Sequence, residues 1–356
     1  MSRSQASPKD RVEQLLKTTE RIVVKVGTNL IDGQKGFNLP MLAGLASDLA
    51  DLRSQGKQVI LVTSGAVGAG RRLIGTIQGY PKSMPERQAC AALGQAQLMH
   101  LYQELFQHYG CRVAQVLLTE DAVTDRERYV NARNTLEKLL EWGVIPIINE
   151  NDTVATDELK FGDNDRLSAL VASKVHAQLL ILLTDVDGLY DQPPQTGKGT
   201  LIEYVEHLSP EIESAAGHKG SNYSIGGMKA KIVAVEISMR SGILAAIANG
   251  NRFGIVHTIL QGEGPATWFL PSGKPLSSKK AWLATSKRVC EGKILVDQGA
   301  QDALLGKGKS LLPIGVIQIK GRFKSGDTVS ICDSKGKELA RGLVNFSQDE
   351  LILIAG

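Results

Sequence analysis

The chain has 356 residues, of which 42% are hydrophobic, 22% are charged and 5% are aromatic. This length suits two domains, and the composition supplies ample apolar material for a globular core. A formal net charge of +4 is small for such a chain, so neither nucleic acid nor a membrane surface is indicated as the main partner.

Short β-branched runs alternate with longer amphipathic segments from Arg21 onward. Continuous apolar runs predict strands at Ile22–Val26, Val59–Val62, Val113–Leu118, Val144–Ile148, Leu179–Leu183 and Ile243–Ala248. Helical spacing predicts one helix that begins near Asn38 and others at Pro85–Tyr109, Asn131–Trp142, Arg166–Val175 and Met228–Arg240. Strands that are apolar throughout and separated by helices predict an α/β fold, with a largely parallel sheet sandwiched by helices.

The character of the chain changes after residue 270. The segment Leu270–Arg288 has two prolines, five basic residues and no acidic residue, which is typical of a linker or surface connection. Beyond it, the short runs KILV, VIQI, TVSICD and LILIA predict strands of a small β-rich module. We therefore expect an N-terminal extension at 1–20, an α/β domain at 21–275, a linker at 276–288 and a β-rich domain at 289–356.

Cysteine usage and the absence of signal patterns indicate a reduced compartment. The four cysteines are far apart and form no CxxC pair, which argues against a disulfide framework and a zinc site. The N-terminal segment has no apolar signal core, and no apolar run reaches ~18 residues. We expect a soluble, cytoplasmic protein without a membrane span. The six histidines show no HxxxH or HxH spacing, so no protein-held metal is expected.

Polar motifs follow four of the predicted strands at the point where each strand ends. KVGTN follows the first strand, TSGAVGAG the second, NENDTV the VIPII strand and TDVDGLY the LLILL strand. Ligands of open parallel α/β sheets bind outside the carboxyl ends of the strands. The four motifs therefore predict one binding site at that rim of the sheet.

Two lysines and a glycine-rich turn suit an anionic ligand at this rim. Lys25 lies in an apolar strand, where burial without an anionic partner is costly, although a lysine that extends to solvent fits the pattern equally well. Lys231 lies just inside a predicted helix start, and two lysines aimed at one rim would suit phosphoryl transfer. The turn Gly65–Gly70 reads GxxGxG, which is neither a dinucleotide fingerprint nor a P-loop. It is either a plain strand-to-helix turn or an anion site built on backbone N–H groups.

The segment from Ile148 to Asp165 is unusually acidic, with six carboxylates, three asparagines and one lysine. Such a composition fits a divalent-metal site, a solvated loop or a pocket for a cationic group. Composition alone leaves all three interpretations open.

Six motifs, in their order along the chain, resemble the amino acid kinase family and in particular its glutamate 5-kinase branch. They are IVVKVGTN, VTSGAVGAGR, VIPIINENDTV, FGDNDRLSALVA, LLTDVDGLY and GGMKAK. The β-rich tail, with LVDQGA and LLPIGV, is similar to a PUA domain. The resemblance implies the amino acid kinase fold for residues 21–275. It also implies transfer of the ATP γ-phosphate to the side-chain carboxylate of L-glutamate, which gives L-glutamyl 5-phosphate in the first step of proline biosynthesis.

The resemblance also implies roles for individual residues. Lys25 and Lys231 would flank the phosphates, and Asp165 would orient both lysines. Glutamate would be bound by Ser64, Gly65, Ala66, Asn149, Asp152 and Asn164. The nucleotide would be contacted by Lys25, Thr184, Asp185, Gly226, Gly227, Met228, Lys229, Ala230 and Lys231. On this interpretation the acidic segment recognises an amino acid, and its intervening residues 157–160 lie on a loop that helps to close the pocket.

ATP and Mg²⁺ are the implied cofactors. The metal would be held mainly through the nucleotide, because Mg²⁺ gives up its water reluctantly and is rarely held by all-protein cages. The resemblance further implies a homo-oligomer and feedback inhibition by proline at or near the glutamate pocket.

The chain departs from the family pattern at two places. The nucleotide loop, which commonly reads GTGGMxTK, here has Ser224 and Ile225 before the glycines and Ala230 before Lys231, so two hydroxyls near the phosphates are lost. The chain ends at Gly356, where members of the family commonly continue into a last PUA strand. This departure leaves open whether the tail domain is complete.

Two rival functions account for parts of the sequence. Another amino acid kinase, acting on carbamate, acetylglutamate, aspartate or a nucleoside monophosphate, would share the lysines, but the β-rich tail argues against it. RNA binding by the tail is not favoured either. Residues 289–356 hold nine basic and eight acidic residues, whereas binding driven by phosphate contacts favours a more basic face.

Overall fold

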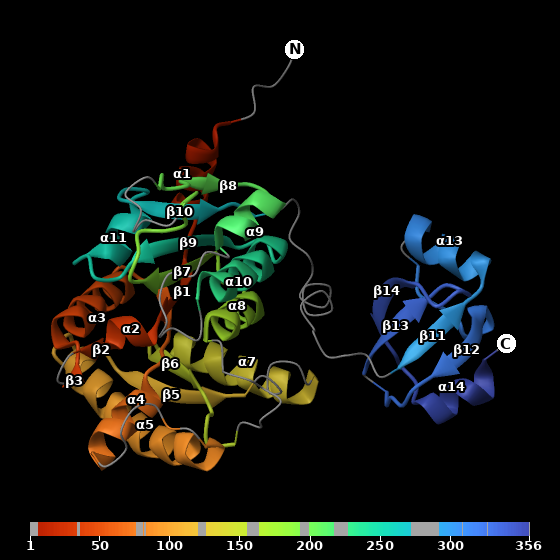
Figure 1. Ribbon diagram of the computed structural model, residues 1–356, viewed down its shortest axis with the longest axis horizontal. Coiled ribbons are helices and arrows are strands. Elements are labelled where there is room, and N and C mark those ends of the chain that lie inside the picture. The colour runs from red at the N-terminus through yellow and green to blue at the C-terminus, as the bar shows by residue number, and fades with distance from the viewer. Residues whose placement is uncertain are drawn as a thin grey trace. The chain divides into compact units, whose positions relative to one another are not determined.

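The structure is a computed structural model that describes residues 6–33, 36–75, 81, 83–119, 126–154, 164–192, 199–216, 227–271, 292–307, 309–325 and 327–355. The chain divides into two compact units, Met1–Leu276 and Ser277–Gly356 (Figure 1). Within the described ranges, no helix combines the length and the apolar character that crossing a membrane requires.

An eight-stranded sheet runs through the larger unit in the order β5-β6-β4-β1-β7-β9-β10-β8. Its strands are β1 (Arg21–Val26), β4 (Gln58–Val62), β5 (Val113–Leu118), β6 (Ile145–Glu150), β7 (Leu179–Thr184), β8 (Tyr204–Val205), β9 (Leu244–Asn249) and β10 (Ala266–Phe269). All pairings from β5 to β9 are parallel, and β10 pairs with β9 antiparallel. A short hairpin of β2 (Asp32–Gly33) and β3 (Gly36–Phe37) lies outside this sheet.

Helices cover both faces of the sheet. Successive residues of a strand point to opposite faces, so Ile22 and Val24 of β1 join one core cluster while Val23 joins the other. Figure 1 shows α3 and α11 on one side of the strands and α8 and α10 on the other. The helices of this unit are α1 (Pro8–Lys17), α2 (Thr28–Ile31), α3 (Leu39–Ser54), α4 (Ala66–Ile74), α5 (Met84–Gln107), α7 (Arg126–Glu141), α8 (Asn164–Lys174), α9 (Pro210–Ala216), α10 (Met228–Arg240) and α11 (Ile255–Leu260).

The six strands and five helices predicted for this unit are all present. Strand β5 and helix α10 have the predicted bounds, and the other elements are shifted at one or both ends. The prediction missed β8 and β10, because runs of two and four residues are too short to stand out as strands. Helix α7 begins at Arg126, five residues earlier than predicted. Helix α1 lies in the segment treated as an extension, and its Val12 and Leu16 are buried in the first core cluster.

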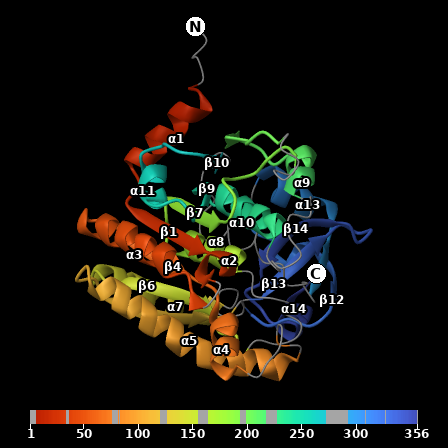
Figure 2. The ribbon, with the colours of Figure 1, turned by 60° about the vertical axis from the view of Figure 1, so that its left-hand side comes forward.

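Helices α4 and α5 lie side by side in both views (Figures 1 and 2). A Cβ on Gly70 would lie 1.8 Å from the carbonyl oxygen of Cys90, and a Cβ on Gly94 would lie 1.8 Å from that of Ala66. Only glycine at both positions lets the two backbones approach this closely. The crossing therefore fixes where α4 begins, directly after β4.

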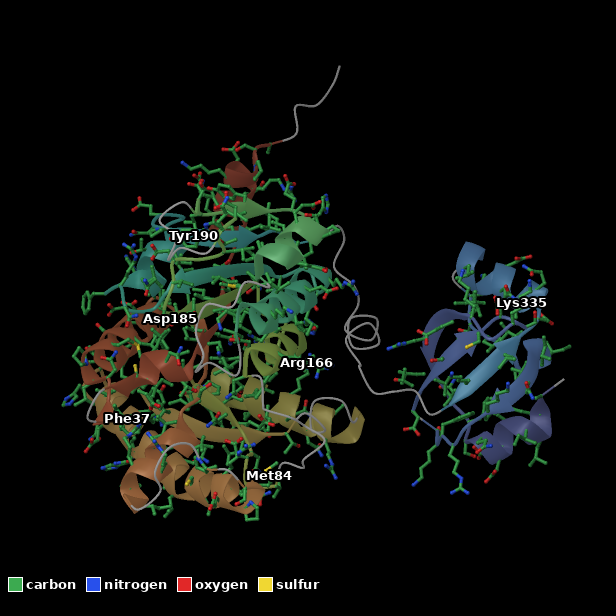
Figure 3. The ribbon with its side chains drawn as sticks, viewed as in Figure 1. Phe37, Met84, Arg166, Asp185, Tyr190 and Lys335 are labelled. Atoms are coloured by element: carbon green, nitrogen blue, oxygen red, sulfur yellow. The ribbon has the colours of Figure 1, made fainter. Side chains whose placement is uncertain are left out.

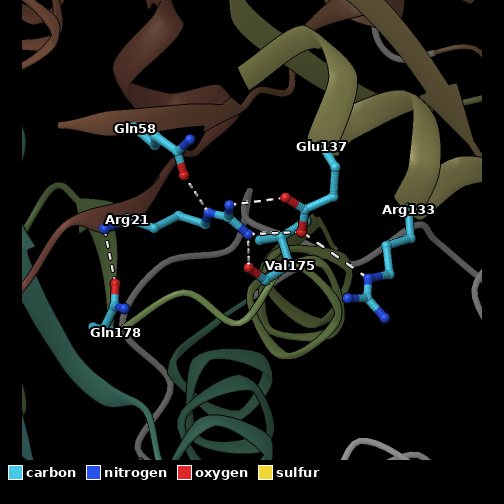
Figure 4. Close-up of polar contacts among 6 residues, drawn as sticks. All are labelled: Arg21, Gln58, Arg133, Glu137, Val175 and Gln178. Carbon is cyan, nitrogen blue, oxygen red and sulfur yellow. Dashed lines mark hydrogen bonds and ion pairs between the residues drawn. The ribbon is translucent and has the colours of Figure 1, made fainter. Parts of the chain in front are cut away.

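Arg21 ties together the end of the sheet that is remote from the predicted rim (Figure 4). Its Nη1 and Nη2 donate to the two carboxylate oxygens of Glu137 at 2.8 and 2.9 Å, and its Nε donates to Gln58 Oε1 at 2.8 Å. Its guanidinium also donates to the carbonyl of Val175. This bidentate, half-buried arrangement joins β1, β4, α7 and the end of α8 into one platform.

The smaller unit is built on a four-stranded sheet in the order β12-β11-β13-β14. Its elements are β11 (Lys293–Val296), α13 (Gln298–Lys307), the 3-10 helix η2 (Pro313–Gly315), β12 (Val316–Lys320), β13 (Thr328–Cys332), β14 (Glu338–Leu343) and α14 (Gln348–Ile354). Its small core consists of Ile294, Val296, Val316, Phe323, Val329, Ile331 and Leu351.

The prediction of a strand at LILIA was wrong. These residues lie in and just after α14, which Ser347 caps. The Ser347 hydroxyl accepts from the Glu350 backbone N–H at 3.4 Å, and the Glu350 carboxylate accepts from the Ser347 N–H at 2.7 Å. This reciprocal capping box sets a helix start that outweighs the β-propensity of the apolar run.

Candidate active site

Four neighbouring parallel strands, β6, β4, β1 and β7, bring the four polar motifs to one edge of the sheet. The topology thus confirms that the motifs share a rim. Each motif begins where its strand ends, so the side chains come from points far apart in the sequence and meet only because the strands are parallel.

An ion-pair triad occupies this rim. Lys25 Nζ lies 2.5 Å from Asp165 Oδ1, and Lys231 Nζ lies 2.9 Å from Asp165 Oδ2. The three residues are only 5%, 1% and 8% exposed, in the order Lys25, Asp165 and Lys231. Lys25 is therefore buried against a carboxylate, which excludes the alternative of a lysine that extends to solvent.

Electrostatics explains why the triad is stable. Burial alone would raise the pKa of Asp165, but the two ammonium groups outweigh burial and lower it. The carboxylate also lies in the first turn of α8, where the helix dipole favours negative charge. Two ammonium groups held at one place suit an anionic ligand.

The helices α8 and α10 bring two members of the triad together. Gly227 precedes the first turn of α10, and Lys231 lies on the buried side of this helix with Ile232, Ala234 and Val235. The same side packs against α8. Because both helices begin at the rim, Asp165 and Lys231 meet beside the end of β1, where Lys25 lies.

A second polar group consists of four side chains joined by amide hydrogen bonds. Asn164 Nδ2 donates to Ser64 Oγ and to Asn149 Oδ1, both at 3.0 Å. Asn149 Nδ2 in turn donates to Gln95 Oε1 at 2.8 Å. We call this group, Ser64, Asn164, Asn149 and Gln95, the amide chain. It adjoins the triad, because Asn164 and Asp165 are consecutive.

The remaining residues predicted to bind glutamate surround the amide chain. Gly65 has a left-handed backbone (φ 92°) at the start of α4, and Ala66 is buried in its first turn. Asp152 is half-buried in the turn after β6, and burial raises its pKa to about 6. Among the described residues, Asp152 makes no hydrogen bond to the amide chain.

The predicted nucleotide residues lie after β7 and at the start of α10. Thr184 Oγ1 donates to Asp185 Oδ1 at 3.1 Å, and Asn29 of α2 donates to Asp185 Oδ2 at 3.4 Å. Figure 3 shows the labelled Asp185 beside α2. The first turn of α10 contains Met228, Lys229 and Ala230. Gly226 lies outside the described residues, as do Ser224, Ile225 and the loop at 157–160.

Sequence reasoning missed two polar groups at this rim. Gln95 belongs to the buried face of α5, and the available signal was a polar residue within an apolar stripe at helical spacing. Arg252, after β9, donates to both carboxylate oxygens of Asp187 at 2.9 Å and lowers the pKa of that carboxyl. This pair joins the turns that follow β7 and β9, next to Thr184.

The family models and the named relatives agree with each other. A model of the amino acid kinase family matches residues 20–249, and a model of the PUA domain matches residues 292–356. A protein of Geobacter sulfurreducens named glutamate 5-kinase is 46% identical over 344 residues, covering 96% of this chain and 92% of its own. A protein of the same name from Thermoanaerobacter sp. (strain X514) is 47% identical over 338 residues, covering 94% and 90%. A solved UMP kinase from Ureaplasma parvum aligns with a TM-score of 0.49 at 12% identity, over 71% of this chain and 99% of that chain.

Proposed function

Because the chain belongs to the amino acid kinase family, we propose that it phosphorylates the side-chain carboxylate of L-glutamate with ATP. The product is L-glutamyl 5-phosphate, and the reaction is the first step of proline biosynthesis. The observation that carries this proposal is the buried triad of Lys25, Asp165 and Lys231, adjoined by a neutral amide chain.

The reaction needs no base to activate its nucleophile. A glutamate side chain has an ordinary pKa of about 4.3, so its carboxylate is already ionised at neutral pH. One carboxylate oxygen attacks the γ-phosphorus, the bond from that phosphorus to the β–γ bridging oxygen breaks, and the electron pair leaves with ADP. What the site must provide is positioning and charge stabilisation.

Lys25 and Lys231 provide the charge stabilisation. Both ammonium groups are held on one carboxylate in a buried place, so they are arranged before the substrates arrive. During transfer, negative charge shifts toward the β–γ bridging oxygen, and the two fixed ammonium groups stabilise this charge. Asp165 is a positioning residue, because it binds the lysines and both its oxygens are occupied.

The amide chain provides a matched set of donors and acceptors for the amino acid. Ser64 Oγ accepts from Asn164, so its own O–H remains available to donate to a carboxylate of glutamate. Asn164 Oδ1 is buried and has no hydrogen-bond partner among the described residues, so it can accept from the α-ammonium group. Asp152 is close in the sequence to Asn149 of the amide chain, and it adds a carboxylate for the same ammonium group.

The nucleotide would lie over the ends of β7 and β9 and the start of α10. Thr184, Asp185 and the segment Gly227–Lys231 border this region, and the N-terminus of α10 favours phosphate. Mg²⁺ would be held mainly by phosphate oxygens and water, where it neutralises charge on the phosphates. The donor set fits this arrangement, since both lysines bind the carboxylate of Asp165.

An ADP-release assay across acceptors tests the proposal. We expect release that depends on L-glutamate and is much slower with carbamate, acetylglutamate, aspartate or a nucleoside monophosphate. Release with one of these acceptors in place of glutamate would contradict the proposal. A homo-oligomer, inhibition by proline and a cytoplasmic location remain predictions, and proline added to the same assay tests the inhibition directly.

A further inference from the structure

Gln95 is a buried polar residue on an otherwise apolar face of α5. It is 8% exposed and lies in one stripe with Gly94, Leu98 and Tyr102. Burying a side-chain amide is costly unless hydrogen bonds compensate. Gln95 has no contact with a substrate in the proposed reaction, so its place beside the glutamate pocket requires a physical explanation.

The direction of each hydrogen bond in the amide chain follows from one backbone group. The N–H of Glu150 can only donate, and it donates to Asn149 Oδ1 at 2.9 Å. This assigns the oxygen of Asn149, and its Nδ2 must therefore face Gln95. Gln95 can accept there only with Oε1, so its amide orientation is assigned as well.

The orientation of the Asn149 amide also determines the hydrogen bonds of Asn164 and Ser64, the residues proposed to contact the substrate. Asn149 Oδ1 also accepts from Asn164 Nδ2, which donates onward to Ser64 Oγ. Asn149 is 1% exposed, so no solvent could replace Gln95 as the acceptor for Nδ2. Loss of this acceptor would leave a buried donor unsatisfied and favour rotation of the Asn149 amide, which would remove the acceptor that holds Asn164.

The Nε2 group of Gln95 indicates that Oε1 is the atom of this amide that holds Asn149. Gln95 Nε2 is buried and has no hydrogen-bond partner among the described residues. An unsatisfied buried donor typically destabilises a protein by about 1–3 kcal/mol. The fold tolerates this donor while it keeps the oxygen of the same amide on Asn149, and such tolerated costs are typical of functional sites.

We propose that Gln95 is a positioning residue for glutamate recognition, whose Oε1 holds the Asn149 amide so that Asn164 and Ser64 face the amino acid in the correct orientation. The inference depends on the proposed glutamate kinase activity. It concerns the amino-acid end of the site and not the lysines, so it predicts an effect on glutamate affinity and little effect on ATP affinity.

Kinetics of two Gln95 variants tests the inference. Gln95→Met keeps the side-chain size and loses the acceptor, so the glutamate KM should rise about tenfold, as loss of one buried hydrogen bond implies, with the ATP KM nearly unchanged. Gln95→Glu keeps an oxygen acceptor at the same position and should restore a glutamate KM closer to that of the parent chain. In a variant that already carries Asn149→Ala, Gln95→Met should raise the glutamate KM little further, because both substitutions remove the same hydrogen bond.

Leu98→Val serves as the matched control. It lies in the same stripe, one turn further along α5, and weakens core packing without touching the amide chain. It should lower the thermal midpoint while the glutamate KM stays unchanged. Three results would overturn the inference. They are an unchanged glutamate KM in Gln95→Met, additive effects of Gln95→Met and Asn149→Ala on this KM, and a glutamate KM that is higher in Gln95→Glu than in Gln95→Met. Failure of the proposed function is distinct, because the parent chain would then release no ADP with glutamate.

Discussion

The triad of Lys25, Asp165 and Lys231 places two ammonium groups on one buried carboxylate. Ammonium groups held where solvent is scarce attract an anion strongly. A ligand that binds only the folded chain stabilises the fold. We therefore expect the nucleotide phosphates to stabilise the larger unit as well as to react there.

Lys231→Met should reduce kcat far more than it changes the glutamate KM. Removal of one preorganised charge from a developing anion typically reduces kcat by about 100-fold or more. Steady-state kinetics with glutamate and ATP varied separately measures this effect. Lys138→Met is a suitable control, since Lys138 is an exposed lysine of α7 that pairs with Glu141 on the surface. Unchanged kcat in Lys231→Met would remove this lysine from the site.

Asp152 links glutamate binding to pH. Burial raises its pKa from 3.8 to about 6, so the folded free chain binds a proton here more tightly than the unfolded chain does. Its contribution to stability is therefore greatest below pH 3.8 and is lost as the pH rises through about 6. Binding of an ammonium group requires the charged form, so kcat/KM for glutamate should fall as the pH drops below about 6.

Asp152→Asn separates these two effects. The neutral amide avoids the cost of a desolvated charge, so the thermal midpoint of the free chain at pH 7.5 should rise. The glutamate KM should rise about tenfold because the partner of the ammonium group is lost. The fall of kcat/KM below about pH 6 should be absent from this variant. A glutamate KM equal to that of the parent chain would refute the role of Asp152.

Much of the site could be predicted at the scale of single residues, and the rest could not for a physical reason. Lys25 stands out in the sequence because a lysine in an apolar strand needs a partner, and Lys231 because it follows two glycines at a helix start. The role of Asp165 followed from the resemblance to the amino acid kinase family. Gln95 does not stand out in this way, because a glutamine is common in helices and its importance depends on the neighbour it meets. That neighbour, Asn149, comes from a strand 54 residues away in the sequence.

At the scale of elements, the α4–α5 crossing places the first turn of α4 beside the amide chain. Gly94→Ala would put a methyl group 1.8 Å from the Ala66 carbonyl oxygen, and backbone atoms cannot move away as a side chain can. The free energy of unfolding should fall by about 3 kcal/mol, and the glutamate KM should rise because Ala66 is displaced. Chemical denaturation and steady-state kinetics measure the two effects.

Gly44→Ala is the matched control for that substitution. Gly44 is also a glycine inside a helix, and its added methyl group would meet only the ring of Phe253, at 3.2 Å. Phe253 is 85% exposed and can turn away. This variant should be neutral or gain up to about 1 kcal/mol from helix propensity. If both alanine variants lost equal stability, the close crossing would not be the cause.

Helices and strands were predictable where a long run of residues shows one periodicity. They were not predictable where a helix cap or a pairing with another strand decides the structure. The parallel core strands are continuous apolar runs, and their parallel direction follows from helical crossovers. The apolar run in α14 predicted a strand, but the segment forms a helix because a capping box at Ser347 and Glu350 outweighs that run. Strand β10 was missed because its place between β9 and β8 depends on pairing with both of those strands.

At the scale of the whole molecule, two compact units agree with the separate matches to the amino acid kinase and PUA models. The rim of the larger unit carries every described residue assigned to catalysis and substrate binding. The change in composition after residue 270 already indicated two units from sequence. The role of the smaller unit was not predictable, because its charge is nearly balanced and its sequence supplies no reactive cluster.

Trapping the product with hydroxylamine tests the central claim most directly, because acyl phosphates react with it to give hydroxamates. With ATP, Mg²⁺ and L-glutamate, the chain should form the side-chain hydroxamate of glutamate in equal amount to ADP. Lys231→Met should form far less. ADP release without a glutamyl hydroxamate, or a hydroxamate at the α-carboxylate, would contradict transfer to the side chain.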